Sequence, residues 1–518
     1  MLLPRVIFVL AILVILRLTT RKSSKDAREP PVAPSRIPFI GHLLGMFTYQ
    51  GAYFKSLTVL YPSWPIFTLE ILSVKIYVVS SPDLAQSLLC NTKALSFHPF
   101  HIAFTNRVLG ARQEIKDIVA QNGGDNRYNN DLHNDMYAAL ALGPDIHETN
   151  SRVVNSLAQF FNVICTSEQP RHLFAWMKNA FTLSTAESFY GAQNPFADNP
   201  DFVNSVWDFE EGLPTLFLGI FPRITARKAW TARKNIAPAF ADYYDKGLDQ
   251  HANAFIKGRA KCGRVEGFTN DDLGTFEITV LFASLTNTVP NAFCMLTHML
   301  SDPTLTSEIC EEVQRVATRT TINGIDHVSL DITAFNTKCP ILISTFQETV
   351  RTCINATPVR VVTEDMMLKD KYLLKKGAII QVSGGSMHES PKFWGDDVAT
   401  FNPYRHLKTK ELTKEQRKAQ SQGLMPFGGG KHLCPGRHLA FVEIVSFVAM
   451  FVYGFEVRMK NGSGLVRPPP SKKQPLGENS KKPKFDLEVL IRRKEEFRGA
   501  VFGLVVDSSV DAKTVSSL

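Results

Sequence analysis

The sequence lacks paired cysteines. Its eight cysteines stand singly in a chain of 518 residues, and no two of them form a Cys-x-x-Cys pair. This pattern argues against the disulfide framework of small secreted domains and against zinc sites built on cysteine pairs. We therefore expect unpaired cysteines in a reducing compartment. The positions are Cys90, Cys165, Cys262, Cys294, Cys310, Cys339, Cys353 and Cys434.

The sequence also lacks internal repeats, low-complexity tracts and motifs typical of nucleic-acid binding. Hydrophobic residues make up 44% of the chain, and the composition is even from about residue 50 to residue 460. These features indicate one large globular domain or two merged ones. The net charge of +9 and the isoelectric point near 9.0 then favour an anionic membrane surface or an acidic partner protein, and no nucleic acid.

An uninterrupted apolar run lies near the N-terminus, from Val6 to Leu16, between Arg5 and Arg17. The run is short for a membrane span, so a cleaved signal peptide is one interpretation. No small-x-small cleavage site follows it, and the flanking arginines can lengthen the span by snorkelling. We favour an uncleaved transmembrane anchor over residues 1–22. Because positive charge follows the run, the bulk of the chain should lie on the cytoplasmic side.

A basic, proline-rich hinge follows at residues 23–45. Prolines at this density give a stiff, extended connector. The remaining residues, 46–518, form the predicted globular body. The body begins with β-branched, partly alternating sequence from Pro65 to Ser81, which predicts a two-strand hairpin followed by a helix that Pro82 begins.

The most informative stretch is 426–436, PFGGGKHLCPG. A single cysteine, Cys434, follows a glycine-rich loop and precedes a segment that is apolar nearly all round, which predicts a buried helix. A helix N-terminus carries positive partial charge, so we expect it to favour the thiolate. Phe427 supplies a flat apolar wall and His432 a polar donor. A lone thiolate facing a flat apolar slot suits a haem ligand.

Two other kinds of site could contain such a loop. A buried structural cysteine in a glycine-rich turn is the first. A phosphate-binding loop is the second, because Gly430 and Lys431 resemble the end of a Walker motif. That motif needs glycine at position 425 and serine or threonine at position 432, where this chain has Met425 and His432. The phosphate interpretation therefore fails.

The FGGGKHLCPG segment resembles the haem-binding loop of the cytochromes P450, F-G-x-G-x-[HR]-x-C-x-G, at every fixed position. The resemblance implies the P450 fold, mainly α with a small β lobe, for a haem-binding catalytic domain over residues 46–518. It also implies haem b as the cofactor, with the axial thiolate supplied to the iron by Cys434. The other cofactor-binding residues in this loop would be Phe427, Gly428, His432 and Gly436.

Two further motifs occur in the order found in that family. Glu348 and Arg351 lie three residues apart in a helical stretch, where they can pair, although such pairs are common on surfaces. About fifty residues later, FNPYRH resembles the family's F-x-P-x-R pattern, which implies that Arg405 shares the same carboxylate. The resemblance therefore implies a buried structural network of Glu348, Arg351 and Arg405, from which no member can be removed without leaving an unpaired charge.

Arg360 stands in a strand-like run, ATPVRVV. An arginine there suits a bidentate contact with an anion, and a surface-strand arginine is the alternative. By resemblance Arg360 would contact a haem propionate. The family often adds a Trp-x-x-x-Arg pair in the helical middle section, and this chain has none, so the residue that replaces that contact stays open.

A long helical stretch from Leu273 to Leu300 holds polar residues at its centre, with Pro290 among them. Proline removes a backbone hydrogen bond, so we expect a distorted helix, either a plain kinked one or one that serves a ligand. By resemblance this is the oxygen-binding helix. Asn287 stands where the family has an acid, and Thr288 stands at the hydroxyl position. This Asn-Thr-x-Pro variant is similar to a subgroup with sterol 7α- and 12α-hydroxylases and prostacyclin synthase.

The resemblance implies a haem-thiolate monooxygenase that oxidises a lipophilic sterol, terpenoid or polyketide-like molecule, with Asn287 and Thr288 as catalytic residues. The implied partners are NADPH-cytochrome P450 reductase and the endoplasmic reticulum membrane, with the catalytic domain facing the cytosol. Basic residues from Lys408 to Lys418 could attract the reductase, although solvated charge is the plainer interpretation. A reductase-independent isomerase or dehydratase and a non-catalytic haem sensor stay open as alternatives.

Overall fold

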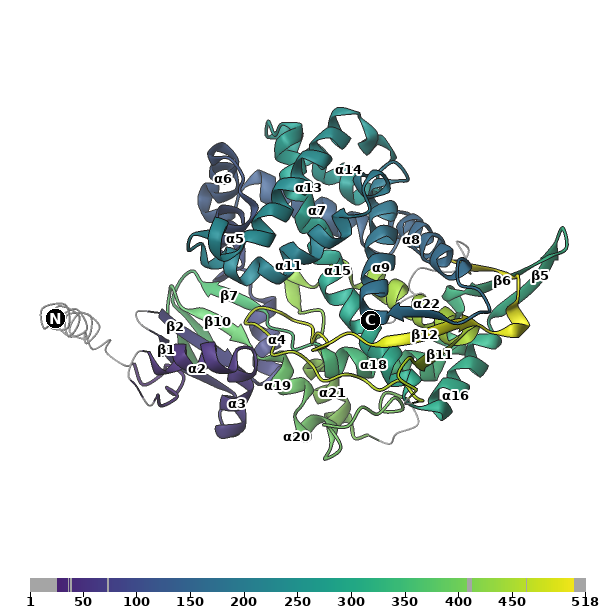
Figure 1. Ribbon diagram of the computed structural model, residues 1–518. Coiled ribbons are helices and arrows are strands. Elements are labelled where there is room, and N and C mark those ends of the chain that lie inside the picture. The colour runs from purple at the N-terminus through teal and green to yellow at the C-terminus, as the bar shows by residue number, and fades with distance from the viewer. Residues whose placement is uncertain are drawn as a thin grey trace, which may run out of the picture.

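The computed structural model describes residues 26–35, 37, 40–71, 74–407, 412–462 and 464–506. Helices make up most of the molecule, and strands lie at both its left and its right end in Figure 1. The predicted mainly α fold with a small β lobe is confirmed. The longer helices are α7 (Arg127–Ala139), α8 (Pro144–Asn162), α9 (Leu173–Tyr190), α11 (Phe202–Leu218), α13 (Arg227–Asp245), α14 (Ala254–Val265), α15 (Asn270–Leu300), α16 (Pro303–Gln314), α18 (Pro340–Cys353) and α22 (Arg437–Gly454).

Shorter helices connect these elements. They are α2 (Gly41–Tyr49), α3 (Ala52–Leu60), α4 (Pro82–Cys90), α5 (His98–Phe104), α6 (Gln113–Ala120), α10 (Pro195–Asp198), α12 (Pro222–Thr225), α17 (Phe335–Lys338), α19 (Gly384–His388), α20 (Pro391–Trp394) and α21 (Lys414–Gly423).

The β lobe is a five-stranded sheet in the order β1-β2-β10-β7-β3. Its first two strands form the predicted antiparallel hairpin, and α4 follows directly, with Pro82 in its first turn. The strands are β1 (Ile66–Ile71), β2 (Val74–Val79), β10 (Ile379–Val382), β7 (Val359–Val362) and β3 (Leu95–Ser96).

Three smaller sheets complete the fold. Two have three strands each, ordered β11-β12-β4 and β13-β6-β5, and β8 pairs with β9. Their bounds are β4 (Gln169–His172), β5 (Ala317–Ile322), β6 (Ile325–Asp331), β8 (Met366–Leu368), β9 (Tyr372–Leu374), β11 (Phe455–Met459), β12 (Glu488–Arg493) and β13 (Val501–Val505).

Within the predicted hinge, the stretch around Ala33 pairs with the β lobe, whereas residues 41–45 belong to α2. The backbone N–H of Ala33 donates to the Thr68 carbonyl at 2.9 Å, and the Thr68 N–H donates to the Pro31 carbonyl at 2.8 Å. Proline suits this position because the outer strand of a sheet need not donate along its free edge. The predicted anchor, residues 1–22, lies outside the described residues.

Two core helices hold the molecule together. α15 begins at a capping box between Thr269 and Asp272 and continues unbroken through Pro290, so the predicted distortion does not interrupt it. α22 is the buried helix predicted after the cysteine loop. Both are long and apolar enough to cross a membrane, but the apolar windows of α15 and α22 are 67% and 83% buried inside the protein, as expected for core helices.

One pair of cysteines departs from the expectation that all are unpaired. Cys294 on α15 is bonded to Cys353 at the end of α18, and the other six cysteines are free. The two helices pack against each other, which brings together residues 59 positions apart. Cysteine spacing alone cannot reveal such a pair.

Candidate active site

The cysteine loop is held by its own backbone and by α4. The Cys434 N–H donates to the Phe427 carbonyl at 2.9 Å, which closes the loop. Gly428 has a φ of 77° and Gly430 a φ of 64°. A Cβ at Gly430 would lie 1.8 Å from the Leu89 carbonyl oxygen of α4, so no other residue fits there. Glycine is therefore required at position 430 because the loop backbone packs directly against the backbone of α4.

The helix after the loop begins three residues beyond Cys434. Pro435 and Gly436 form a turn, and α22 starts at Arg437. The backbone N–H groups of Gly436 and Arg437, together with the Arg437 guanidinium, lower the pKa of the Cys434 thiol, as the helix-terminus argument predicts. Burial outweighs them and raises the pKa above its ordinary value. The contribution predicted for the helix end is therefore present, but removing the sulfur from water disfavours its charged form more strongly.

The predicted network of buried charges is present in full. The Glu348 carboxylate accepts hydrogen bonds from Arg351 Nε at 2.8 Å, from Arg351 Nη2 at 2.7 Å and from Arg405 Nε at 3.1 Å. Burial would raise the pKa of Glu348, but hydrogen bonds from Arg351 and from His406 hold it at about 2. The Asn402 N–H adds a further bond at 3.0 Å. These contacts tie α18 to the segment that leads to the cysteine loop.

Arg360 lies buried on β7, with 5% of its surface exposed, so the surface-strand alternative is wrong. Its Nη1 donates to the Val359 carbonyl at 2.7 Å, and its guanidinium lies 5.8 Å from the Phe97 ring centre. Among the described residues no carboxylate lies within ion-pair distance of it. A buried cation without a counter-charge is costly, and burial accordingly lowers the pKa of Arg360.

His432 lies close to this arginine. Its ring is 5.4 Å from Phe97 and 5.5 Å from His133 of α7. Burial, followed by the charge of Arg360, lowers the pKa of His432 to about 3. A neutral, half-buried imidazole and a buried guanidinium therefore lie near the same Phe97 ring, and both can donate hydrogen bonds to an anion.

Helix α7 contributes two residues that the sequence analysis missed. Tyr137 donates from its hydroxyl to the Leu433 carbonyl at 2.5 Å, one residue before Cys434. His133 lies one turn earlier, with its ring centre 4.2 Å from that of Tyr137. The two residues have the i, i+4 spacing of the missing Trp-x-x-x-Arg pair. A search for any polar or aromatic pair at that spacing could have found them.

The centre of α15 has one open face. Ala283 is exposed and Ser284 and Asn287 are partly exposed in an otherwise mostly buried stretch of the helix. The Thr288 hydroxyl donates back to the Ser284 carbonyl at 2.7 Å. The Asn287 side-chain oxygen accepts a hydrogen bond from Ser480, at 2.9 Å, in the C-terminal segment. Sequence analysis named Asn287 and Thr288 but not Ser480, which no motif marks.

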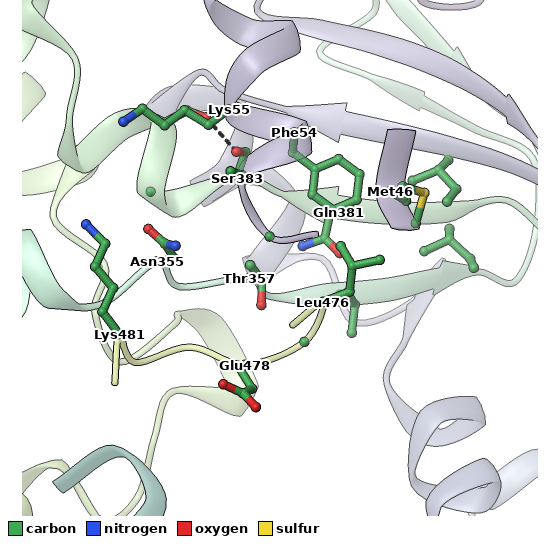
Figure 2. A pocket seen from close by; sticks show the side chains of 18 of the residues that line it. Met46, Phe54, Lys55, Asn355, Thr357, Gln381, Ser383, Leu476, Glu478 and Lys481 are labelled. Carbon is green, nitrogen blue, oxygen red and sulfur yellow. Dashed lines mark hydrogen bonds between the residues drawn. The ribbon is translucent and has the colours of Figure 1, made fainter. Parts of the chain in front are cut away.

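A cavity of about 350 Å³ lies between α3, the β lobe and the C-terminal segment. Figure 2 shows apolar side chains, Met46, Phe54 and Leu476, on one side, while Lys55 and Lys481 lie toward the other. Both lysines bind Glu389, Lys481 at 2.9 Å. Burial lowers the pKa of Lys481 to about 8. The cavity therefore combines an apolar wall with a charged end.

Residues 30–487 match the family model described as Cytochrome P450. The chain belongs to the cytochrome P450 family. It is 32% identical over 481 residues to a cytochrome P450 monooxygenase of Gibberella zeae, with 90% of each chain covered. It is 28% identical to the monooxygenase nodJ of Hypoxylon pulicicidum, with 95% of each chain covered. It is also 23% identical to cholesterol 7-alpha-monooxygenase of Cricetulus griseus, with 91% of this chain and 94% of the relative covered.

A P450 is a haem enzyme, an oxidoreductase whose iron is bound by a cysteine thiolate, and the described residues fit that group. Arg360 is a buried cation that needs an anion, which a haem carboxylate supplies. Cys434 has a free thiol, with two backbone N–H groups directed at its sulfur. Bound to iron, the sulfur would exist as the thiolate despite its burial, because a coordinating thiol loses its proton.

Proposed function

We propose that this P450 hydroxylates or otherwise oxidises an amphipathic, lipophilic small molecule of the sterol, terpenoid or polyketide type. It would use dioxygen and electrons that NADPH-cytochrome P450 reductase supplies. The observation that carries this proposal is the free cysteine loop beside the buried Arg360, which has no counter-charge among the described residues, in a chain of the cytochrome P450 family. The cavity of about 350 Å³ has an apolar wall that suits a fused-ring or isoprenoid skeleton, and none of the residues assigned to the haem site lines it. The relatives named as fungal monooxygenases and as a cholesterol monooxygenase support the same substrate class.

We assign the residues of the haem site as follows. Cys434 holds the iron, Arg360 and His432 donate to the haem carboxylates, and Phe427 packs against the ring. Haem bound through a thiolate supplies the chemistry that activates dioxygen. The remaining cofactor residues, Gly428 and Gly436, shape the loop, and Glu348, Arg351 and Arg405 fix the chain segment that leads to it.

The open face of α15 carries the proposed catalytic residues. Thr288 has a hydroxyl that can release its hydrogen bond to Ser284 and hold or pass a proton. Asn287 cannot ionise, so it can orient a group but cannot act as an acid. Proton supply should therefore run through water and the Thr288 hydroxyl.

Helix α21 is the proposed docking site for the reductase. Its exposed Lys414, Arg417 and Lys418 form no ion pair among the described residues, and the neighbouring Lys408 and Lys410 lie outside them. The helix packs on α4, which also contacts the turn just before Cys434. The basic residues thus lie on the cysteine side of the molecule, where an acidic partner could approach the haem edge.

The membrane assignment rests on the N-terminal run and on exposed apolar side chains. Phe221 and Ile224, between α11 and α13, are 75% and 79% exposed, and Phe47 on α2 is 65% exposed. Such side chains suit a lipid surface. We propose an endoplasmic reticulum anchor over residues 1–22, a hinge at 23–45 and a cytosolic catalytic domain over 46–518.

One experiment tests the function directly. The full-length protein is reconstituted in vesicles with the reductase and titrated with sterols, terpenoids and polyketides, while the haem optical spectrum is followed. A substrate should convert the haem from low to high spin and then yield an oxidised product that requires NADPH and dioxygen. A protein that holds haem but shifts with none of these classes and consumes no NADPH would contradict the proposal.

A second candidate is favoured by Asn287, because an amide replaces the acid expected for proton supply. It is a P450-fold isomerase or dehydratase that rearranges a peroxide and needs no reductase. Turnover of a lipid hydroperoxide without NADPH would establish it in place of the monooxygenase.

Deletion of residues 1–28 tests the anchor. The truncated protein should move to the soluble fraction and keep its haem. A full-length gene product recovered without its N-terminus would instead indicate a cleaved signal peptide, which would place the body in the lumen.

A further inference from the structure

A buried chain of hydrogen bonds connects the centre of α15 to the C-terminal segment. Ser480 is 2% exposed and touches two residues of the helix. Its Oγ lies 2.9 Å from the Asn287 side-chain oxygen and 2.9 Å from Asn291 Nδ2. Asn291 Nδ2 also donates to the Asn287 backbone carbonyl at 2.6 Å. Three polar side chains separated by as many as 193 positions thus form one unit.

The direction of each hydrogen bond in this unit follows from counting protons. A backbone carbonyl can only accept, so the Asn291 group facing the Asn287 carbonyl must be the NH₂. That NH₂ also faces Ser480, so the Ser480 oxygen accepts from it. The hydroxyl of Ser480 in turn donates to the Asn287 side-chain oxygen, which the structure places toward it.

The Asn287 NH₂ group is therefore directed away from Ser480. Among the described residues no atom accepts a hydrogen bond from it. Asn287 is only partly buried, and Ala283, one turn earlier on the same side of the helix, is exposed. The amide donor thus lies on the open face of α15, where a ligand can reach it.

We propose that Ser480 is a positioning residue that locks the Asn287 amide as a hydrogen-bond donor toward a ligand on the open face of α15. This inference rests on the proposed function, because it takes that face to be the one that meets the haem. In this arrangement Asn287 stabilises an acceptor atom on the ligand and carries no proton itself. The same C-terminal segment places Lys481 in the cavity, so one short stretch joins the cavity wall to the centre of α15.

Carbon monoxide is the probe that tests the proposal, because its stretching frequency on reduced haem reports nearby hydrogen-bond donors. Wild type should give one main band, and Asn287→Ala should shift that band to the frequency of an apolar pocket. Ser480→Ala should give two bands, since the amide is free to flip. The ratio of the two orientations should change about fivefold, as expected for one lost hydrogen bond.

Two further variants separate positioning from mere structural support. Ser480→Thr keeps the hydroxyl and should restore the single wild-type band. Ser480→Cys keeps a side chain of similar shape but replaces the hydroxyl with a thiol, which is a poor hydrogen-bond donor. This variant should also split the band, and it provides the test if the alanine variant loses its haem. Ser471→Ala, an exposed serine of the same segment, is the matched control and should behave as wild type.

The outcomes decide between distinct conclusions. A single unshifted band in both Ser480→Ala and Ser480→Cys, with haem content unchanged, would overturn the role of Ser480. A band that splits equally in Ser480→Thr would also overturn it, because the hydroxyl would then not be the cause. A wild type that lacks the reduced-CO absorption of thiolate-ligated haem would overturn the proposed function, and this inference with it.

Discussion

The two sides of the proposed haem site are built differently. On the cysteine side, which comprises the loop 426–436 and the network around Glu348, nearly every important residue belongs to a recognisable motif. On the α15 side, which comprises the centre of α15 and the C-terminal segment 471–483, Asn287 meets Ser480 across 193 positions and no motif marks the contact. Iron ligation needs one fixed geometry, whereas a substrate pocket can be assembled from whichever segments meet there.

The comparison predicts that the cysteine side tolerates no change. Cys434→Ala should abolish the reduced-CO absorption band of thiolate-ligated haem, because no other described thiol lies in such a loop. Cys165→Ala, at an exposed free cysteine, is the control and should keep the band. If the Cys434 variant kept the band, the ligand assignment would be wrong.

Breaking the buried network should have the next largest effect. Glu348→Ala leaves Arg351 and Arg405 buried without their shared carboxylate, which should cost about 3–5 kcal/mol of unfolding free energy and reduce haem incorporation. Chemical denaturation and haem content measure this. Glu311→Ala removes an exposed glutamate from α16 and should change little. Equal stability of the two variants would show that the network contributes nothing particular.

On the α15 side we expect a substitution to uncouple NADPH consumption from product formation while the fold stays intact. Thr288→Ala should keep substrate binding and haem reduction but release peroxide, so that less product forms per NADPH consumed. Proton delivery by a positioned group contributes about 10²-fold or more, which makes the change measurable. Thr275→Ala, at a half-buried threonine on the same helix whose hydroxyl donates to the Asp271 carbonyl, is the control. A Thr288 variant as tightly coupled as wild type would remove this hydroxyl from the mechanism.

A smaller effect concerns pH and a buried acid on α22. Burial raises the pKa of Glu443 to about 8, and its hydrogen bond from Thr185 only partly opposes this. Between pH 4.5 and pH 8 the unfolded chain loses this proton while the folded protein keeps it, so stability falls as pH rises. Glu443→Gln removes this dependence. Its unfolding free energy relative to wild type should rise by at most about 1.4 kcal/mol per pH unit over that range. A constant difference in thermal or chemical denaturation from pH 5 to pH 8 would contradict the prediction.

The smallest expected effect lies on the surface of the cysteine side. The double change Lys414→Glu and Arg417→Glu should slow reductase-supported turnover several-fold at low salt and less at high salt, because exposed charges are screened. Lys228→Glu with Lys234→Glu on α13 is a control of equal charge change. If both double variants slowed turnover alike, net charge would be the cause and α21 would not be the docking site.

The features that could be predicted from sequence lie mainly on the cysteine side, and those that could not lie mainly on the α15 side. The loop, the Glu348 network, the buried setting of Arg360, the first hairpin and the two core helices follow from short patterns in which neighbouring residues act together. The Cys294–Cys353 bond and the Ser480 contact could not, because both depend on how distant segments pack. The net pKa shift of Cys434 could not be predicted either, because a helix terminus is visible in sequence, whereas the extent of burial is not.

The unpaired guanidinium of Arg360 has a consequence for how much of this protein a cell can maintain. Without the cofactor, the folded chain buries a positive charge that has no counter-charge among the described residues. A haem carboxylate would supply that partner, so cofactor binding should stabilise the folded state as any tightly bound ligand does. Chains made faster than haem becomes available would unfold more often and be degraded sooner. The abundance of this protein should therefore follow the haem supply of the cell.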